Sequence, residues 1–274
     1  MKPRNIFEIP GRISVEGEII TPLNELSIVE AVRKFKSQDK STIAVSFIHS
    51  YSNNSHELRA KELILEEYPE ASVSLSSEVL AVFREYERTI TTVLNAYVSP
   101  KVSNYIRNLQ EGLSELSIDA SLSIMKSNGG MVGFDIAAEQ PVQTALSGPA
   151  AGVMASVQIT KNMGIKDSIS FDMGGTSTDV SLIQNQHPTT HLFGKLGDWP
   201  IQLPMLDIAT IGCGGGSIAE VSQFDSLTVG PKSAGAVPGP VCYEKGGIHP
   251  TVTDANLVLG RINNSIAGDA LKLN

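Results

Sequence analysis

Short apolar runs alternate with stretches of helical periodicity in the first half of the chain. Residues 42–48 (TIAVSFI) are apolar and rich in β-branched side chains, which is typical of a buried strand. Asn54, with Glu57 three residues later, resembles a capping box, so we expect a helix to begin there and to end before Pro69. Residues 71–75 form the next strand candidate. This alternation predicts an α/β fold.

The same pattern continues to about residue 130. Apolar positions between residues 90 and 98 recur at the spacing of one helix face. Ser99 and Pro100 have the character of an N-cap and a first-turn proline, which predicts that a second helix starts there. A strand is expected at residues 122–125, followed by a turn at residues 128–130.

The most informative segment is residues 168–183, SISFDMGGTSTDVSLI. Apolar and polar residues alternate on both sides of DMGGTSTD, which predicts two strands joined by a tight turn. Neither a GK[ST] sequence nor a following helix is present, so this is not a P-loop. A glycine pair lets backbone N–H groups point at one anion, and the neighbouring hydroxyls add donors. The alternative is a hydrophilic hairpin turn, for which such sequences are common.

Two further segments contain glycines that predict local structure. Residues 206–219 (LDIATIGCGGGSIA) run from an apolar strand into a glycine turn that suits either a flat ring such as a purine or a structural corner. Ser217 stands where a GxGxxG fingerprint needs its last glycine, so a dinucleotide site is excluded. Residues 147–163 predict a helix with Gly164 as its C-terminal cap.

Composition changes along the chain. Only three of the 24 glycines, but 30 of the 50 charged residues, lie in the first 120 positions. We therefore expect a helix-rich α/β part at residues 1–120 and a glycine-rich part at residues 121–274, whose backbone turns sharply and closely approaches another group.

Charge and cysteine content narrow the function classes. A net charge of −8 without a basic block argues against nucleic-acid binding. The longest uncharged stretch, residues 140–160, is too polar to span a membrane, and the N-terminus lacks the apolar core of a signal peptide. Cys213 and Cys242 are isolated, which favours a reducing compartment. A cytoplasmic protein is expected.

Six motifs in one order resemble the hydantoinase A/oxoprolinase family, and the resemblance covers nearly the whole chain. Segments 85–100 (EYERTITTVLNAYVSP) and 47–57 (FIHSYSNNSHE) match the region upstream of them. The six motifs are SNGGMVG (127–133), ALSGPAAGV (145–153), FDMGGTSTDVSLI (171–183), IGCGGGSIAEV (211–221), VGPKSAGAVPGPVCY (229–243) and TVTDANLVLGRI (251–262).

The resemblance implies one half of an actin-like ATPase of the ribonuclease H-like class, with a mixed sheet flanked by helices. It assigns the second phosphate loop to DMGGTSTD and the adenosine-side turn to GCGGGS. It also implies residue roles: Asp172 orients Mg²⁺ or water, and Asp179 joins it as a catalytic carboxylate. The implied phosphate contacts are Gly174, Gly175, Thr176 and Ser177, and the implied nucleoside contacts are Gly214, Gly215 and Gly216.

By the same resemblance, the function is a segment of an ATP-dependent hydrolase A-type subunit. Such a subunit phosphorylates the carbonyl of a cyclic amide, a hydantoin or 5-oxoproline, and a hydantoinase B-type subunit or domain hydrolyses the ring. ATP and Mg²⁺ are the implied cofactors, and homo-oligomerisation is left open. The family's first phosphate loop lies upstream of Met1, so the isolated chain is expected to be inactive. The alternatives are a piece of an ATP-dependent ketone carboxylase and a non-catalytic fragment that binds partner subunits. A sugar or acetate kinase is disfavoured by the motif order.

Overall fold

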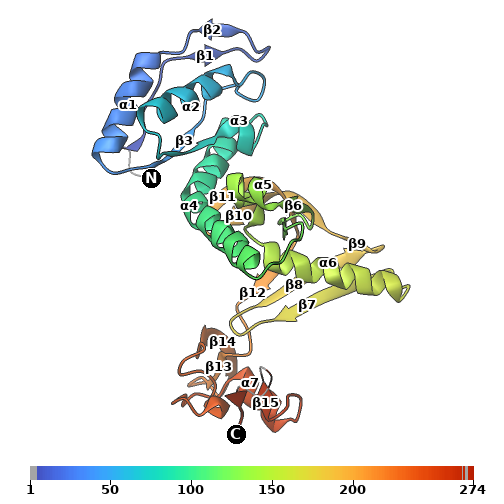
Figure 1. Cartoon of the computed structure of the whole chain (residues 1–274). Coiled ribbons are helices and arrows are strands. Elements are labelled where there is room, and N and C mark those ends of the chain that lie inside the picture. Colours follow the sequence, from blue (N-terminus) through green and yellow to red (C-terminus); the bar gives the residue numbers. More distant parts are fainter. Residues whose placement is uncertain (1–4, 267, 269–270) are drawn as a thin grey trace. The chain divides into compact units, whose positions relative to one another are not determined.

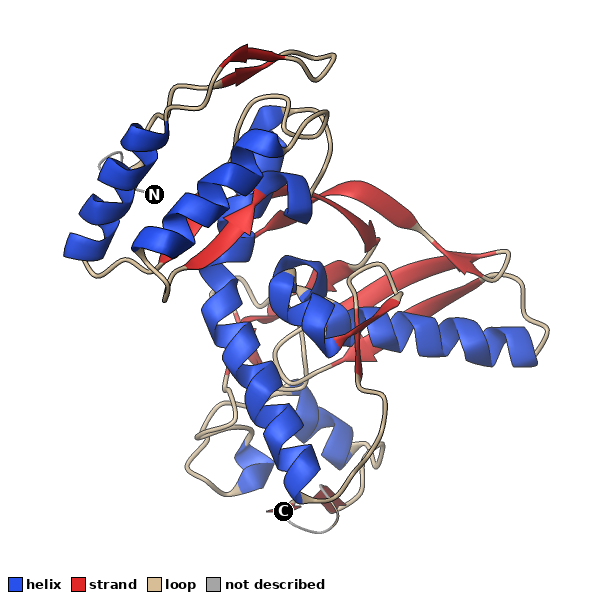
Figure 2. Cartoon of the chain, turned by 45° about the horizontal axis from the view of Figure 1, so that its top comes forward, coloured by secondary structure: helices blue, strands red, loops and turns tan. Residues whose placement is uncertain are grey.

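The computed structural model describes residues 5–266, 268 and 271–274, and the chain has a mixed α/β fold (Figures 1 and 2). It divides into two compact units. The first unit comprises Met1–Ser147 with Thr190–Met205, and the second comprises Gly148–Thr189 with Leu206–Asn274. The division therefore lies at residue 147 rather than at residue 120, and one later segment belongs to the first unit. Composition could not reveal this segment, because it follows the glycine-rich hairpin in sequence.

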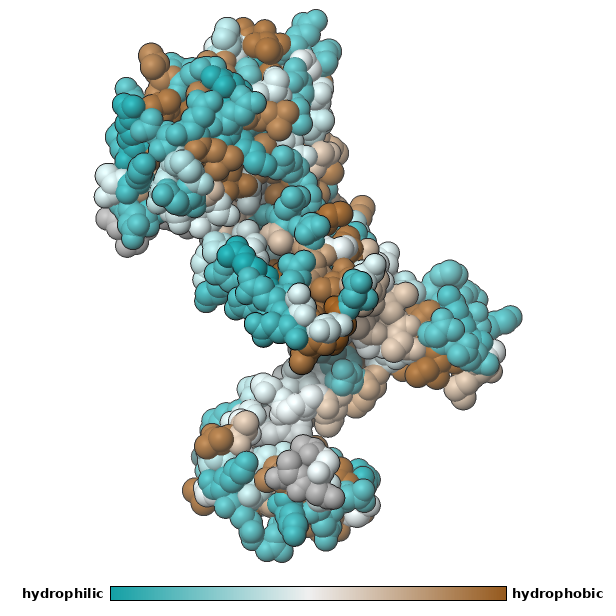
Figure 3. Space-filling model, viewed as in Figure 1, coloured by the Kyte–Doolittle hydropathy of each residue, from teal (hydrophilic) through white to brown (hydrophobic). Residues whose placement is uncertain are grey.

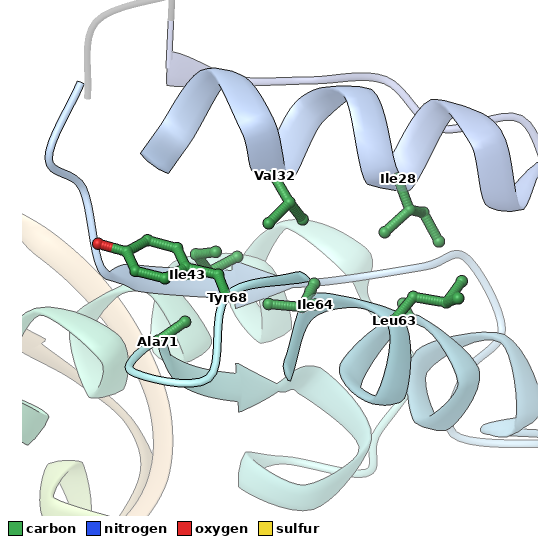
Figure 4. Packing of buried hydrophobic residues seen from close by; sticks show 8 residues of the cluster. Ile28, Val32, Ile43, Leu63, Ile64, Tyr68 and Ala71 are labelled. Carbon is green, nitrogen blue, oxygen red and sulfur yellow. The ribbon is translucent and has the colours of Figure 1, made fainter. Parts of the chain in front are cut away.

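The first unit begins with two helices on a small parallel sheet. The parallel strands β3 and β4 align Ile43 with Val73. Ile28 and Val32 of α1 point toward Ile43 and the side chains of α2, so the two helices and the sheet share one core (Figure 4). The elements are β1 (Arg12–Ile13), β2 (Ile19–Thr21), α1 (Glu25–Ser37), β3 (Thr42–Val45), α2 (Ser55–Glu67) and β4 (Ser72–Leu75).

The expected capping box at α2 is wrong. The side chain of Asn54 makes no capping hydrogen bond. The carboxylate of Glu57 is fully buried and accepts hydrogen bonds from Phe47 N (2.8 Å), Ser76 Oγ (2.6 Å) and Ser77 N (2.8 Å). Glu57 therefore ties α2 to the segments that follow both strands, a tertiary role that local spacing cannot distinguish from a cap.

The remainder of the first unit is organised around one long helix, α4 (Glu85–Glu115). The sequence predicts two helices that divide at Ser99 and Pro100, but Pro100 lies inside a continuous helix. Ala96 and Ile106 are both buried, so packing continues past the proline and outweighs the one backbone hydrogen bond that it removes. The other elements are α3 (Ser76–Val79), β5 (Ser123–Met125), β6 (Met131–Gly133), α5 (Phe134–Glu139) and the 3₁₀ helix η2 (Pro141–Thr144).

The hairpin of β10 (Thr190–Leu196) and β11 (Trp199–Leu206) returns to this unit. Ile201, Leu203 and Met205 of β11 are buried in one cluster with Val79 and Val142. This apolar packing explains why a segment so late in the sequence belongs to the first unit.

The second unit contains the predicted glycine-rich hairpin. Strands β7 (Ser168–Met173) and β8 (Thr178–Gln184) are antiparallel and join β12 (Ala209–Ile211) and β9 (His187–Pro188) in one sheet. Helix α6 (Ser147–Asn162) runs beside this hairpin (Figures 1 and 2), and Gly164 follows it with φ +69°. The remaining elements are β13 (Ser217–Val221), β14 (Leu227–Ser233), the 3₁₀ helix η3 (Val241–Tyr243), α7 (Val252–Val258), β15 (Ser265–Ile266) and β16 (Leu271–Lys272).

The surface carries apolar as well as polar side chains (Figure 3). On the β7–β8–β12 sheet, one face presents exposed side chains at alternating positions, namely Ile169, Phe171, Leu182 and Ile211. Across the described part of the chain, no helix combines the length and the hydrophobicity that crossing a bilayer requires.

Candidate phosphate-binding site

The turn between β7 and β8 carries the predicted phosphate-binding residues. Gly174, Gly175 and Thr176 are exposed and Ser177 is half-buried. Gly174 N donates to Ser177 O (2.9 Å), which closes the turn. The N–H groups of Gly175, Thr176 and Ser177 donate to no other described residue. Successive backbone donors without a protein partner are a feature of anion sites that are built from backbone amides.

A second glycine turn, residues 212–216, packs directly on the first. Gly215 N donates to Gly174 O (2.9 Å) and Gly216 N donates to Gly175 O (2.7 Å). Gly214 N donates to Ser217 Oγ (2.8 Å). All three N–H groups are therefore used inside the protein. They orient the peptide groups of the phosphate-loop candidate and are not available as donors to a ligand.

This close packing requires glycine at one position above all. A Cβ on Gly214 would lie 2.7 Å from Gly174 O and 2.7 Å from Ser177 N, both backbone atoms. A Cβ on Gly216 would lie 3.0 Å from Gly175 O. Gly214 and Gly216 are buried, and Gly215 is half-buried. The turn that the family resemblance assigns to a nucleoside thus also supports the exposed turn, and its nucleoside role stays a prediction.

Three hydroxyl side chains fasten the two turns, a role that the sequence did not assign to any of them. Thr178 Oγ1 donates to Cys213 O, and Thr178 is 2% exposed. Ser217 is fully buried and accepts from Gly214 N. Thr253, at the start of α7, donates both N–H and Oγ1 to Gly215 O (2.8 Å each). Hydroxyl residues next to glycine turns were the available signal, but sequence alone does not indicate their partners.

The two predicted carboxylates lie directly opposite each other on β7 and β8. Asp179 Oδ1 accepts from Thr210 Oγ1 (2.6 Å). Asp172 is exposed, and its Oδ2 lies 3.8 Å from the position that a Cβ on Gly152 of α6 would occupy. The small residue on α6 leaves room beside this carboxylate.

These carboxylates fit the way in which proteins hold Mg²⁺, through one or two carboxylates together with water and substrate phosphates. A metal site built from protein ligands alone would need more of them. The described residues contain no group of three or more His, Cys, Asp or Glu side chains that could hold a metal ion. Asp172 and Asp179 are therefore the two carboxylates next to the turn, and their role is part of the proposal below.

Comparison with known proteins identifies the family of the chain. The family model described as hydantoinase/oxoprolinase matches residues 88–274, and the model of the hydantoinase/oxoprolinase N-terminal region matches residues 1–68. The chain belongs to the hydantoinase/oxoprolinase family. The resemblance noted in the sequence is thereby confirmed.

Individual relatives show both the likeness and its extent. The caprolactamase α subunit of Pseudomonas jessenii is 41% identical over 277 residues, which is 99% of this chain and 39% of the relative. The crystal structure of that ATP-dependent caprolactamase superposes with a TM-score of 0.79 at 40% identity, over 99% of this chain and 40% of the other. A nucleotide-free structure of acetone carboxylase gives a TM-score of 0.79 at 28% identity, over 97% and 38% of the two chains.

The 5-oxoprolinase of Dictyostelium discoideum is 36% identical over 271 residues, which is 94% of this chain and 20% of the relative. The chain thus spans about two fifths or less of the length of these relatives. The structural likeness confirms the expected fold class, the mixed α/β fold of an actin-like ATPase half.

Proposed function

We propose that this chain is the phosphate-binding segment of an ATP-dependent A-type subunit that activates a cyclic amide for hydrolysis. The observation that carries the proposal is the β7–β8 turn, because three consecutive N–H groups of this turn have no partner among the described residues. The turn rests on a second glycine turn, in which the N–H groups of Gly214, Gly215 and Gly216 are all hydrogen-bonded. The support comes from relatives named caprolactamase and 5-oxoprolinase.

In this proposal the chain's residues act by position and charge. The N–H groups of Gly175, Thr176 and Ser177, with the hydroxyls of Thr176 and Ser177, bind phosphate oxygens. Gly214, Gly215 and Gly216 hold those donors in place. Such preorganised donors stabilise the charge of a transferring phosphoryl group without reorganising during the reaction.

Asp172 would hold Mg²⁺, with Asp179 close by, and the cation would neutralise phosphate charge. The proposed reaction moves a phosphoryl group from ATP to the carbonyl oxygen of the amide, which creates a good leaving group on carbon. Ring opening by water then belongs to a B-type hydantoinase subunit or domain. The two free cysteines are consistent with a cytoplasmic location, which we include in the proposal.

Calorimetric titration of the chain with Mg·ADP tests the nucleotide part. We expect saturable binding that weakens at least about tenfold in Asp172→Asn, because the variant loses the charge that meets the cation. Asp225→Asn, in the turn between β13 and β14, is the matched control and should bind like the parent chain. Failure of the folded parent chain to bind would contradict the proposal.

A carboxylase function is the second candidate, and the acetone carboxylase superposition favours it. The two reactions differ in their co-substrates. ATP consumption by the subunit assembled with its partner should depend on a lactam in the hydrolase case and on bicarbonate with a ketone in the carboxylase case.

A further inference from the structure

A pocket of about 460 Å³ lies wholly within the first unit, beside the loop that joins β3 to α2. Its lining comes from residues 50–54 of that loop, from residues 16 and 17 at the tip of the β1–β2 hairpin, and from residues 77 and 81. Small-molecule sites enclose roughly 300–1,000 Å³, so this pocket has room for a small ligand. The proposed phosphate chemistry uses none of these residues.

Side-chain hydrogen bonds join the loop to the hairpin. Asn53 Nδ2 donates to Gly17 O (2.7 Å), and Ser52 Oγ donates to Val15 O (3.0 Å). Asn53 also accepts from Ser55 N (3.0 Å) through its Oδ1. These bonds fix two walls of the pocket relative to each other.

The hydroxyl proton of Ser50, a lining residue, is used inside the protein. Ser76 Oγ donates to Glu57 Oε1 (2.6 Å), which takes the one proton that a serine hydroxyl carries. Ser50 Oγ lies 3.0 Å from Ser76 Oγ, so Ser50 must be the donor in that bond. Arg88 Nε donates to the same Ser76 Oγ (3.1 Å). Ser50 Oγ therefore has lone pairs, and no proton, left for a ligand.

Two further side chains at the pocket act only as acceptors. Ser52 gives its hydroxyl proton to the hairpin, and the carboxylate of Glu16 has no proton to give. Two other lining side chains can both donate and accept. The side chain of Asn54 makes no capping hydrogen bond, and Ser77 Oγ is buried without a partner in the described part of the chain. Such an orphaned buried hydroxyl calls for a water molecule or a ligand as its partner.

The charges around the pocket favour a cation. Among the described residues that line it, Glu16 alone is charged, and it forms no ion pair with another described residue. The guanidinium of Arg88 lies behind the lining, 5.5 Å from the centroid of the Tyr51 ring, and is fully buried. The fully buried carboxylate of Glu57 offsets this charge, because both groups bond to Ser76 Oγ.

We infer that this pocket binds a small amino alcohol in its ammonium form. An ammonium group has three donors and no acceptor, which matches the acceptor oxygens of Glu16, Ser50 and Ser52. The hydroxyl of the ligand would meet Asn54 and Ser77, which both donate and accept. A hydrogen bond between an ammonium and a carboxylate is charge-assisted and roughly twice as strong as a neutral one. The inference does not depend on the phosphate-loop candidate, which belongs to the second unit.

Ethanolamine and ethylene glycol test the inference, because they differ only in the ammonium group that replaces one hydroxyl. Titration of the isotopically labelled chain at pH 7, followed by amide NMR, should show saturable shifts of the Ser50, Ser52 and Asn54 signals with ethanolamine. Ethylene glycol should bind about tenfold or more weakly. Equal affinities of the two probes, or no saturable binding of ethanolamine, would overturn the inference.

Two variants with the same change in net charge locate the site. Glu16→Gln should remove the preference for ethanolamine. Glu18→Gln changes the same hairpin at a residue that does not line the pocket, and it should keep the preference. Both glutamates are exposed, so both variants should fold like the parent chain. A preference that survives in Glu16→Gln would overturn the inference, and so would an equal loss in both variants, because general charge attraction would then explain the binding.

Discussion

At the scale of single residues, the packing of the two glycine turns depends on positions that carry no side chain. Gly214 is the most important of these, because a Cβ there would lie 2.7 Å from three backbone atoms of the exposed turn. Backbone atoms cannot swing aside as a long side chain can. The exposed turn and its supporting turn would have to separate.

Gly214→Ala should therefore destabilise the chain by about 1–3 kcal/mol, the usual cost of overpacking, and abolish Mg·ADP binding. Gly212→Ala is the control, since the nearest atom to its Cβ would be Pro231 Cβ at 3.8 Å. Denaturant unfolding and calorimetry measure the two effects. Equal behaviour of the two variants would show that the turns do not rest on each other.

The two cysteines should differ sharply in reactivity. Cys242 is 4% exposed, and burial, together with the Asp254 carboxylate, raises the pKa of its thiol to about 12. Cys213 is only half-buried. At pH 8 a chromogenic disulfide reagent should therefore modify one thiol in the native chain and two after denaturation. Two fast thiols in the native chain would contradict the packing of η3.

The same thiol predicts a stability change at alkaline pH. An unfolded cysteine has a pKa of about 8.5, so above that pH the unfolded state loses a proton that the folded state keeps. The stability contributed by the protonated thiol is complete below about pH 8.5 and is lost as the pH rises toward 12. The variant Cys242→Ala should lose this part of the alkaline destabilisation in thermal melts across that range.

At the scale of elements, Glu57 shows where sequence patterns stop being informative. Its spacing from Asn54 suggested a local cap, but its carboxylate accepts three hydrogen bonds in the interior. The guanidinium of Arg88 joins the same network through Ser76 Oγ (3.1 Å). Glu57→Leu should cost at least about 1–3 kcal/mol, because it leaves the buried donors Phe47 N, Ser76 Oγ and Ser77 N without their acceptor.

Glu62→Leu on the same helix is the matched control. Glu62 forms an exposed ion pair with Arg59 (2.9 Å), and such pairs contribute little. Urea unfolding of both variants measures the difference. A small effect of Glu57→Leu would mean that the buried network does not hold α2 to the strands.

The uncovered face of the β7–β8–β12 sheet makes another prediction. Phe171 and Ile169 are 64% and 66% exposed there. Phe171→Ser should lower the fluorescence of a bound hydrophobic dye and leave the melting temperature almost unchanged. Phe134→Ser, at a position 7% exposed, should instead melt several degrees lower, as expected for a core truncation. Strong destabilisation by Phe171→Ser would contradict the exposure of this face.

Much of this element order could be predicted from periodicity. The β7–β8 hairpin, the helix that ends just before Gly164 and the strands β3 and β4 all follow local patterns of apolar residues. Pro100 could not be placed correctly, because packing on both sides of it decides whether the helix continues. The glycine turns were recognised, but their contact joins residues about 40 positions apart, which no local pattern contains.

At the scale of the whole molecule, the phosphate-loop candidate and the glycine turn that supports it both lie in the second compact unit. Relatives named caprolactamase and 5-oxoprolinase align along nearly all of the chain. The central claim is that the exposed turn binds nucleotide phosphate.

The most direct test is amide NMR of the isotopically labelled chain titrated with Mg·ATP. The signals of Gly175, Thr176 and Ser177 should shift progressively to saturation, because their N–H groups are the free donors of the turn. Those of Gly215 and Gly216 should shift less, since they already donate to Gly174 and Gly175. Unchanged signals from Gly175, Thr176 and Ser177, with shifts located elsewhere or absent, would contradict the account.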